Sequence, residues 1–355
     1  MLYALGPPHL KSRSRHSRRK ALKALLIVNA SASSVTPRSR VVIQKALSAD
    51  HNLEVAETSR RGHASRLARG AANSGFDAVI SLGGDGTLNE TANGLVGTKT
   101  MLGVLPGGST NVFARTIGLP NDPIEATATL LEAMAAPNYA SMGVGTVNGR
   151  CFLFHVGIGF DAAVVEQVEK RGSLKRWAGH PLFIYSAIDT WLRHYDRAQP
   201  HFTVSIPSVT PLAANSSDDS AAKHDADTAA TDRTETETID DGYFAIGMNT
   251  DPYTYLGNRP LSLMPGATSE FGLSLVTLKT LRFLPLVRSI ATSLVRGNGL
   301  KPGRWLDVHR GITSATISGT RPIPFQVDGD YLGAVPILNL GYEPEALNIL
   351  MPLSN

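Results

Sequence analysis

The stretch Ser81-Leu82-Gly83-Gly84-Asp85-Gly86-Thr87 constrains this chain more than any other. It follows the apolar run 77–80, which is typical of a buried strand, and precedes residues 88–93, which are typical of a helix start. Three glycines around an aspartate at such a turn expose backbone N–H groups, and the helix directs its positive dipole end at the same place. The pattern favours phosphate binding, although taken alone it also fits a simple tight turn. It matches neither the Gly-Lys-Ser/Thr phosphate loop nor the dinucleotide fingerprint.

A second glycine-rich turn follows, Pro106-Gly107-Gly108-Ser109-Thr110-Asn111. It comes after the apolar run 102–105, and either Ser109 or Thr110 is the expected N-cap of the next helix. Two such turns on neighbouring parallel strands would lie side by side at the carboxyl ends of the strands. Open α/β sheets bind their ligands at that edge.

The remaining patterns predict an α/β protein in two parts. Strand and helix signals alternate over residues 24–136, which predicts a doubly wound parallel sheet with helices on both faces. Expected strands are 25–28, 53–56, 77–80 and 102–105, and expected helices include 38–48, 63–73 and 124–136. After about residue 140, short alternating apolar stretches predict a mainly antiparallel β domain.

The expected domain boundaries follow composition. Residues 1–22 are predicted to be a disordered basic tail, 23–140 an α/β domain, and 141–355 a β-rich domain. The last residues could return to the N-terminal domain. Residues 208–241 are rich in Ser, Asp, Thr and Ala, so they are predicted to be a disordered insertion.

Two helices are expected within the β domain, near 181–195 and 284–296. The first carries apolar side chains at helical spacing. This spacing favours a helix packed on the sheet over a face that contacts a membrane. The side chains concerned are Phe183, Ala187, Ile188, Trp191 and Leu192.

Charge and cysteine content limit the cellular compartment and the classes of binding partner. Of 355 residues, only Cys151 is a cysteine, and it lies in an apolar run, which excludes an intramolecular disulfide framework and fits a reducing compartment. The net charge of +4 combines a tail of +6 (1–22), a segment of −7 (218–241) and a remainder of +5. A mildly basic body suits ATP and an anionic membrane surface, but the excess is too small to predict a nucleic-acid partner.

No targeting or spanning segment is expected. The apolar stretch 21–28 is short, is interrupted by Lys23 and has no credible cleavage site for a signal peptide. No apolar run approaches 18 residues. Together with the mildly basic body, these observations predict a cytoplasmic protein, peripheral to the membrane. Whether it forms a homodimer is left open.

The motifs resemble the diacylglycerol kinase catalytic domain family, which includes bacterial lipid kinases and the ceramide and sphingosine kinases. The resemblance spans roughly residues 24–350 and rests on Gly83–Thr87, Glu90, Asn93-Gly94, Pro106–Asn111, Phe113–Arg115, Gly157–Ala162 and Asp328-Gly329-Asp330. It implies transfer of the γ-phosphate of ATP, with Mg²⁺, to the hydroxyl of a diacylglycerol or similar lipid alcohol. The resemblance also implies that 23–140 is the nucleotide-binding domain and 141–355 the lipid-substrate domain, with the active site in the cleft between them. The lipid substrate would then be met at the membrane surface. A soluble-substrate kinase and a nucleotide-binding protein without catalysis remain as alternatives.

The resemblance also implies residue roles. Nucleotide contacts are implied at Asn29, Thr58, Gly83, Gly84, Asp85, Gly86, Thr87, Glu90, Gly107, Gly108, Ser109, Thr110 and Asn111. Around Asn29 the chain departs from the family, because Ala30 replaces the usual proline.

Three acids are candidates for catalysis. Asp328 is implied as the general base, although Asp-Gly is also a common turn sequence, and Asp85 and Asp330 are the other candidates. Asp330 is one methylene shorter than the family's glutamate. Asp85 is a candidate contact to Mg²⁺ through water. The family's structural metal site has a pair of acids where this chain has only Glu270, so that site is expected to be weak or absent.

Overall fold

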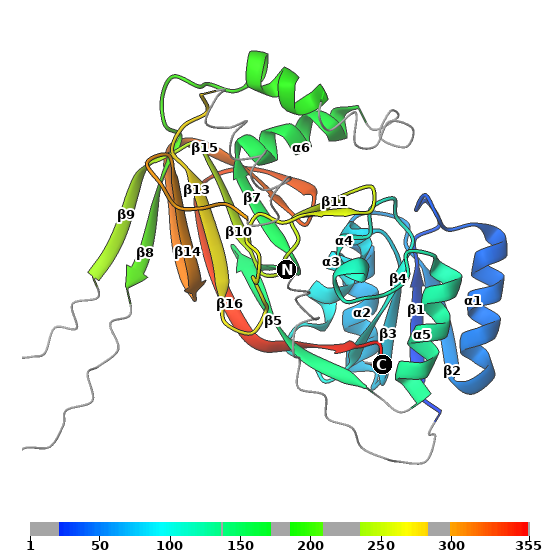
Figure 1. Ribbon diagram of the computed structural model, residues 1–355. Helices are drawn as coiled ribbons and strands as arrows, with labels where there is room; N and C mark the ends of the chain where they lie inside the picture. Colours follow the sequence, from blue (N-terminus) through cyan, green and yellow to red (C-terminus); the bar gives the residue numbers. More distant parts are fainter. Residues whose placement is uncertain (1–20, 136–137, 172–184, 209–234, 283–298, 354–355) are drawn as a thin grey trace, which may run out of the picture.

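The N-terminal part is a parallel sheet whose strands alternate with helices (Figure 1). The computed structural model describes residues 21–135, 138–171, 185–208, 235–282 and 299–353. The strands run parallel in the order β2-β1-β3-β4. In chain order the elements are β1 (Lys23–Val28), α1 (Pro37–Asp50), β2 (Asn52–Glu57), α2 (His63–Asn73), β3 (Ala78–Gly83), α3 (Asp85–Leu95), β4 (Met101–Pro106), α4 (Val112–Thr116) and α5 (Pro123–Ala135).

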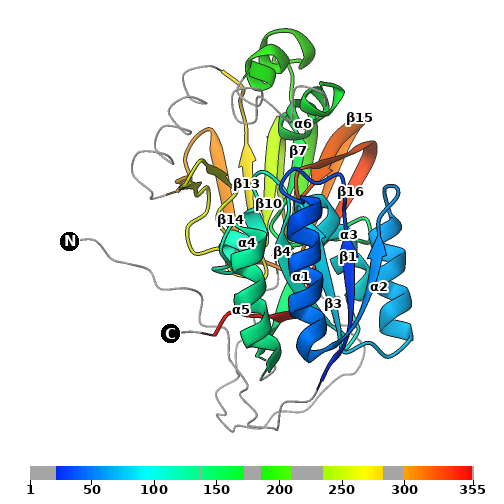
Figure 2. The same cartoon turned by 90° about the vertical axis from the view of Figure 1, so that its right-hand side faces the viewer.

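The parallel sheet is covered on both faces, because its central strands alternate two sets of buried side chains. Leu25 and Ile27 of β1 pack with helices α2 and α3, whereas Leu26 and Val28 pack with α1 and α5. Figure 2 shows α1 and α5 in front of the strands. The predicted doubly wound arrangement is confirmed, and it places the strand-to-helix turns at one edge.

The C-terminal part is built mainly from antiparallel strands. The sheet continues in the order β16-β15-β7-β10-β13-β14, with β8–β9 and β5–β6 pairing beside this path. The predicted β-rich part is thus confirmed. Its elements are β5 (Tyr139–Val147), β6 (Arg150–Phe152), β7 (His155–Gly159), α6 (Phe160–Lys170), a π-helical turn (Thr190–His194), β8 (Phe202–Ser208), β9 (Glu235–Gly242), β10 (Phe244–Met248), β11 (Thr254–Leu256), β12 (Arg259–Leu261), β13 (Leu273–Leu278), β14 (Leu306–Ile312), β15 (Ser314–Val327) and β16 (Asp330–Leu350).

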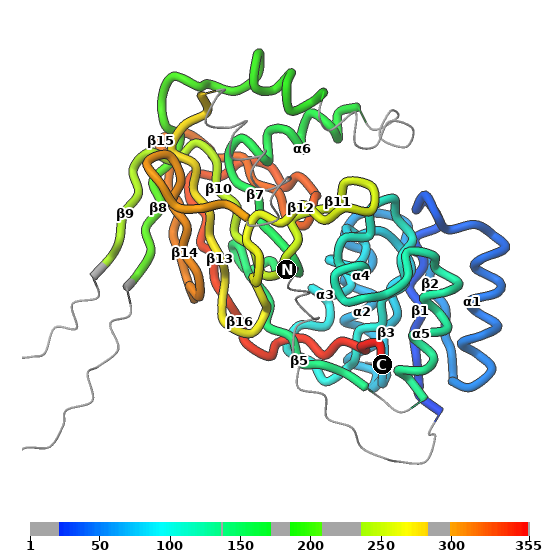
Figure 3. Tube along the Cα trace, in the orientation of Figure 1, coloured from blue at the N-terminus to red at the C-terminus, as the bar shows by residue number. Residues whose placement is uncertain are grey.

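One long strand joins the two parts. β16 pairs antiparallel with β15 and β5, and near its end Ile349 pairs in parallel with Leu102 of β4. The parallel and antiparallel strands therefore form one continuous 14-stranded sheet. The last residues of the chain thus return to the N-terminal part, as the sequence analysis allowed, whereas one continuous sheet was not predicted. The β11–β12 hairpin reaches from the antiparallel part toward α4 (Figure 3).

Several expectations need correction. The predicted disordered segment 208–241 ends too late, since Glu235–Gly242 forms β9, in which Ile239 is buried against the sheet. The predicted tail 1–22 also extends one residue too far, because Leu22 is buried and its N–H donates to His51. Helix α6 was missed. The expected helix 284–296 and most of the predicted tail and insertion lie outside the described residues. Within the described ranges, no helix is both long and apolar enough to cross a membrane.

Candidate active site

The two glycine-rich turns pack backbone against backbone, as their positions on neighbouring strands predicted. The Gly107 N–H donates to the Gly83 carbonyl oxygen at 2.8 Å. A Cβ at Gly107 would lie 2.9 Å from the Gly83 Cα, and a Cβ at Gly108 would lie 2.8 Å from the Gly84 Cα. Both distances are below any tolerable contact, so glycine is required for this approach.

Asp85 joins the two turns. Its carboxylate accepts hydrogen bonds from the backbone N–H groups of Val112 (3.0 Å) and Phe113 (3.2 Å), the first two residues of α4. The predicted N-cap at Ser109 or Thr110 is wrong, because Asn111 holds that position with φ of 50° and Asp85 satisfies the helix N-terminus from the other turn. Desolvation raises the pKa of Asp85, and the nearby Asp330 carboxylate adds to the rise. Its predicted contact to Mg²⁺ through water stays a prediction.

Two backbone N–H groups of the second turn donate to acceptors within the two glycine turns. Besides the Gly107 bond, the Gly108 N–H donates to the Asn111 side chain at 2.8 Å, and Asn111 donates back to the Gly108 carbonyl oxygen at 2.9 Å. Ser109 is exposed at the tip and Thr110 is half-buried. The expected phosphate donors from this turn are therefore fewer than the sequence suggested.

The remaining nucleotide candidates are Asn29, Thr58 and Glu90, and not all of them lie at the glycine turns. Asn29 lies at the turns, since its side-chain amide donates to the Thr87 hydroxyl at 2.9 Å. Thr58 follows β2 and hydrogen-bonds through its N–H to Val28. Glu90 instead accepts from the N–H groups of Gly62 (2.6 Å) and Ala64 at the start of α2. It holds the loop before α2 in place.

Asp328 is buried, with 3 % of its surface exposed, and its carboxylate is surrounded by donors. It accepts from the Asn89 amide (2.8 Å) and from three consecutive backbone N–H groups, at Leu153 (2.8 Å), Phe154 (3.0 Å) and His155 (3.0 Å). Burial raises the pKa of Asp328 to about 6, against these four bonds. The contacts tie α3 to the segment between β6 and β7. The implied role of Asp328 as the general base stays a prediction.

Asp330 is the acid presented to the first glycine turn. A Cβ at Gly86 would lie 2.8 Å from the Asp330 Oδ2 atom, so this carboxylate lies against the turn. The Asp330 side chain is 25 % exposed, and the Arg61 guanidinium lies 3.7 Å from its Oδ1 atom. Asp328 and Gly329 have φ of 47° and 85°, the left-handed values of a two-residue hairpin turn. This turn buries Asp328 and places Asp330 at the glycine loops.

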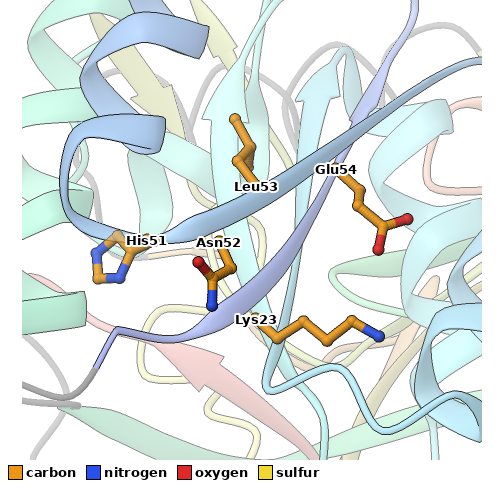
Figure 4. Close-up of a pocket in the computed structure, with 5 residues that line it drawn as sticks. All are labelled: Lys23, His51, Asn52, Leu53 and Glu54. Atoms are coloured by element: carbon orange, nitrogen blue, oxygen red, sulfur yellow. The ribbon is translucent and has the colours of Figure 1, made fainter.

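The expected metal residue Glu270 is exposed on the loop before β13. Across the described part of the chain, no three His, Cys, Asp or Glu side chains gather closely enough to form a protein-only metal site. A shallow surface pocket lies at the opposite ends of β1 and β2 from the glycine turns, lined by Lys23, His51, Asn52, Leu53 and Glu54 (Figure 4). It is not part of the site.

Two residues at the site were missed from the sequence. Arg61 pairs with Asp330, and Asn89 donates to Asp328. Asn89 lies one turn after Asp85 on α3, a spacing that places both on the same helix face, so helical periodicity gave a usable signal. Arg61 lies in a loop and had no periodic signal.

Comparisons with known proteins agree with the motifs. Residues 23–142 match the family model described as the diacylglycerol kinase catalytic domain. The chain is 39 % identical over 121 residues to a Bacillus subtilis protein named diacylglycerol kinase, covering 33 % of this chain and 39 % of that protein. It is 36 % identical over 158 residues to a Chromohalobacter salexigens protein named "Probable lipid kinase YegS-like", covering 43 % and 49 %. The chain thus spans about half, or less, of the length of these relatives.

The fold is also found in solved structures. A Bacillus anthracis str. Sterne crystal structure described as a diacylglycerol kinase superposes with a TM-score of 0.63 at 19 % identity. The match covers 94 % of this chain and 98 % of that one. The likeness confirms the predicted fold class over nearly the whole chain.

Proposed function

We propose, from the membership of residues 23–142 in the diacylglycerol kinase catalytic domain family, that this chain is an ATP-dependent lipid kinase. It transfers the γ-phosphate to the hydroxyl of a diacylglycerol or similar lipid alcohol, giving phosphatidic acid or its analogue. One observation supports this most strongly: the Asp330 carboxylate lies against Gly86, within the first of two glycine turns that pack together. An acid at a phosphate-binding turn can take the proton of an attacking hydroxyl.

In this proposal the turns hold the triphosphate and Asp330 is the general base. Phosphoryl transfer depends on positioning and charge stabilisation more than on covalent help from the protein. Arg61, beside Asp330, limits the directions in which that carboxylate can turn. Asp328 supports the site by fixing the hairpin turn that carries Asp330.

Magnesium fits this site as a companion of the nucleotide. Mg²⁺ is usually held by one or two carboxylates together with substrate phosphates, and in this proposal the carboxylate that faces the ion is Asp85, at the first glycine turn. When bound, the ion neutralises phosphate charge.

The test is a transfer assay with purified protein and γ-labelled ATP. Acceptors are a diacylglycerol, a ceramide and a sphingoid base in mixed micelles, with a soluble sugar and NAD⁺ beside them. We expect label in the lipid phase with diacylglycerol or a related alcohol. Label only in a soluble acceptor would favour a soluble-substrate kinase. ATP binding without transfer would favour a nucleotide-binding protein without catalysis.

We also propose that the helix at residues 185–194 contacts the membrane that holds the lipid. Tyr185, Ile188 and Leu192 follow helical spacing and are 54–55 % exposed, while the opposite side carries Ser186 and Thr190, which are fully buried. Ala187 and Trp191 pack on the core, as predicted. The same prediction is wrong for Ile188 and Leu192, which are exposed, and Phe183 lies outside the described residues. Arg193 is 72 % exposed beside the stripe of Tyr185, Ile188 and Leu192, which suits an anionic surface. In Figure 1 the helix lies on the side toward which β1, β3 and β4 end.

Vesicle binding tests this surface. The double variant Ile188→Ser with Leu192→Ser should bind vesicles containing phosphatidylglycerol about tenfold more weakly than the wild type, because two apolar anchors are lost. Val41→Ser is the matched control, since Val41 is 51 % exposed on α1, away from this helix, and its loss should change nothing. Equal binding by the double variant and the wild type would rule this surface out.

A further inference from the structure

The residues Asp328-Gly329-Asp330, here called the acid-bearing turn, connect β15 and β16 and are held from both sides by side chains of α6. One support is a buried chain of hydrogen bonds that begins at Asp161, in the first turn of this helix. The Gln326 amide donates to Asp161 Oδ2 at 2.7 Å, and the Gln326 carbonyl oxygen accepts from the Gly329 N–H at 2.8 Å. Tyr253 donates to the other oxygen of Asp161 at 2.5 Å. Gln326 and Asp161 are 0 and 5 % exposed, so this support is shielded from water.

The second support is Glu169, in the last turn of α6. Its carboxylate accepts from the Tyr331 N–H at 3.0 Å and pairs with Arg61 at 3.4 Å. Arg61 in turn donates to the Tyr331 carbonyl oxygen at 3.5 Å and lies beside Asp330. The pairing of β15 with β16 shifts register between Phe325 and Gln326. In this irregular region the Tyr331 N–H is taken by Glu169.

These contacts explain why glycine is required just before α6, at position 157. A Cβ at Gly157 would lie 1.7 Å from Asp161 Oδ2 and 2.5 Å from the Gln326 amide nitrogen. Glycine at this position leaves the space that the bond between Asp161 and Gln326 occupies. The motif Gly157-Ile158-Gly159-Phe160-Asp161 therefore accommodates a side-chain contact to the acid-bearing turn.

We infer that α6 is a positioning element for the proposed general base: Asp161, through Gln326, fixes Gly329 on one side of Asp330, and Glu169 fixes Tyr331 on the other. This inference rests on the proposed function, in which Asp330 is the general base. The contacts between α6 and the turn do not depend on that function. With both neighbours of Asp330 restrained, its carboxylate is kept against Gly86. Displacing a reacting group by about 1 Å can cost about 10²-fold in rate.

The test compares two glutamates of the same helix. Glu169→Leu removes the acceptor for Tyr331, Glu169→Gln keeps an acceptor oxygen, and Glu166→Leu is the matched control because Glu166 pairs with Lys170 at 3.0 Å. Two quantities are measured on each full-length variant: the exchange rates of the Gly329 and Tyr331 amide hydrogens by NMR, and kcat with KM for ATP. Glu169→Ala serves if the leucine variant does not fold.

We expect Glu169→Leu to exchange the Tyr331 amide hydrogen at least about tenfold faster and to lose about 10- to 100-fold in kcat, with KM for ATP within about threefold. Glu169→Gln should keep both the Tyr331 exchange rate and kcat close to the wild-type values. Glu166→Leu should equal the wild type in both quantities. Unchanged Tyr331 exchange and kcat in Glu169→Leu, or equal losses in Glu166→Leu, would overturn the inference. If the wild type transfers no phosphate, the proposed function fails, while the exchange rates still decide whether α6 holds the turn.

Discussion

Replacing Asp330 by asparagine should lower kcat by about 10²- to 10⁴-fold, the range typical of a lost general base. The amide keeps the size of the side chain at Gly86 but cannot take a proton from an acceptor hydroxyl. ATP affinity should stay the same or increase, because a negative charge beside the phosphates is removed. The measurement is steady-state transfer to lipid in micelles, with ATP binding followed by calorimetry.

Asp330→Glu is the matched control for this result. It retains the carboxylate and restores the residue that the resemblance implies, so its kcat should lie within about tenfold of the wild type. A kcat for Asp330→Asn within about threefold of the wild type would exclude Asp330 as the base. The base would then have to be sought at Asp85 or Asp328.

Asp328→Ala should lower the free energy of unfolding by roughly 4 kcal/mol or more. Four donors lose their acceptor in a buried place, each at a cost of about 1–3 kcal/mol. Alanine is also less favourable than aspartate at φ of 47°. The expected fall in Tm is on the order of 5 °C, measured by calorimetry.

Asp330→Ala, in the same hairpin, is the control for that experiment and should change Tm by only about 1–2 °C. Asp328→Asn should fall between the two, because asparagine tolerates the left-handed conformation and keeps one acceptor oxygen. If Asp328→Ala folded as stably as the wild type while its kcat collapsed, the assignment of the two acids would be reversed.

The N-terminal elements were predictable because each is marked locally. Buried parallel strands appear in the sequence as short apolar runs. The helix expected at 63–73 has the same bounds as α2. The glycine turns were also predictable, since their spacing on successive strands fixes them at one edge. β9 was missed because its residues are mostly polar and exposed, and only Ile239 reaches the core.

The roles of the two acids in Asp328-Gly329-Asp330 could not be separated from the sequence. Which acid is buried depends on partners far away along the chain, such as Asn89 and Leu153. The turn conformation decides which side chain faces the glycine loops, and a dipeptide such as Asp-Gly does not specify that. The hydrogen bonds of Glu90 were not predictable for a similar reason, because its partners Gly62 and Ala64, at the start of α2, lie far from it along the chain.

The most direct test of the central claim is a crystal structure of the protein with a non-hydrolysable ATP analogue and Mg²⁺. We predict that the triphosphate lies against the turns Gly83–Thr87 and Gly107–Asn111, with the γ-phosphate next to the Asp330 carboxylate and Asp328 still buried. A triphosphate bound away from both glycine turns, or a γ-phosphate facing away from Asp330, would contradict the account.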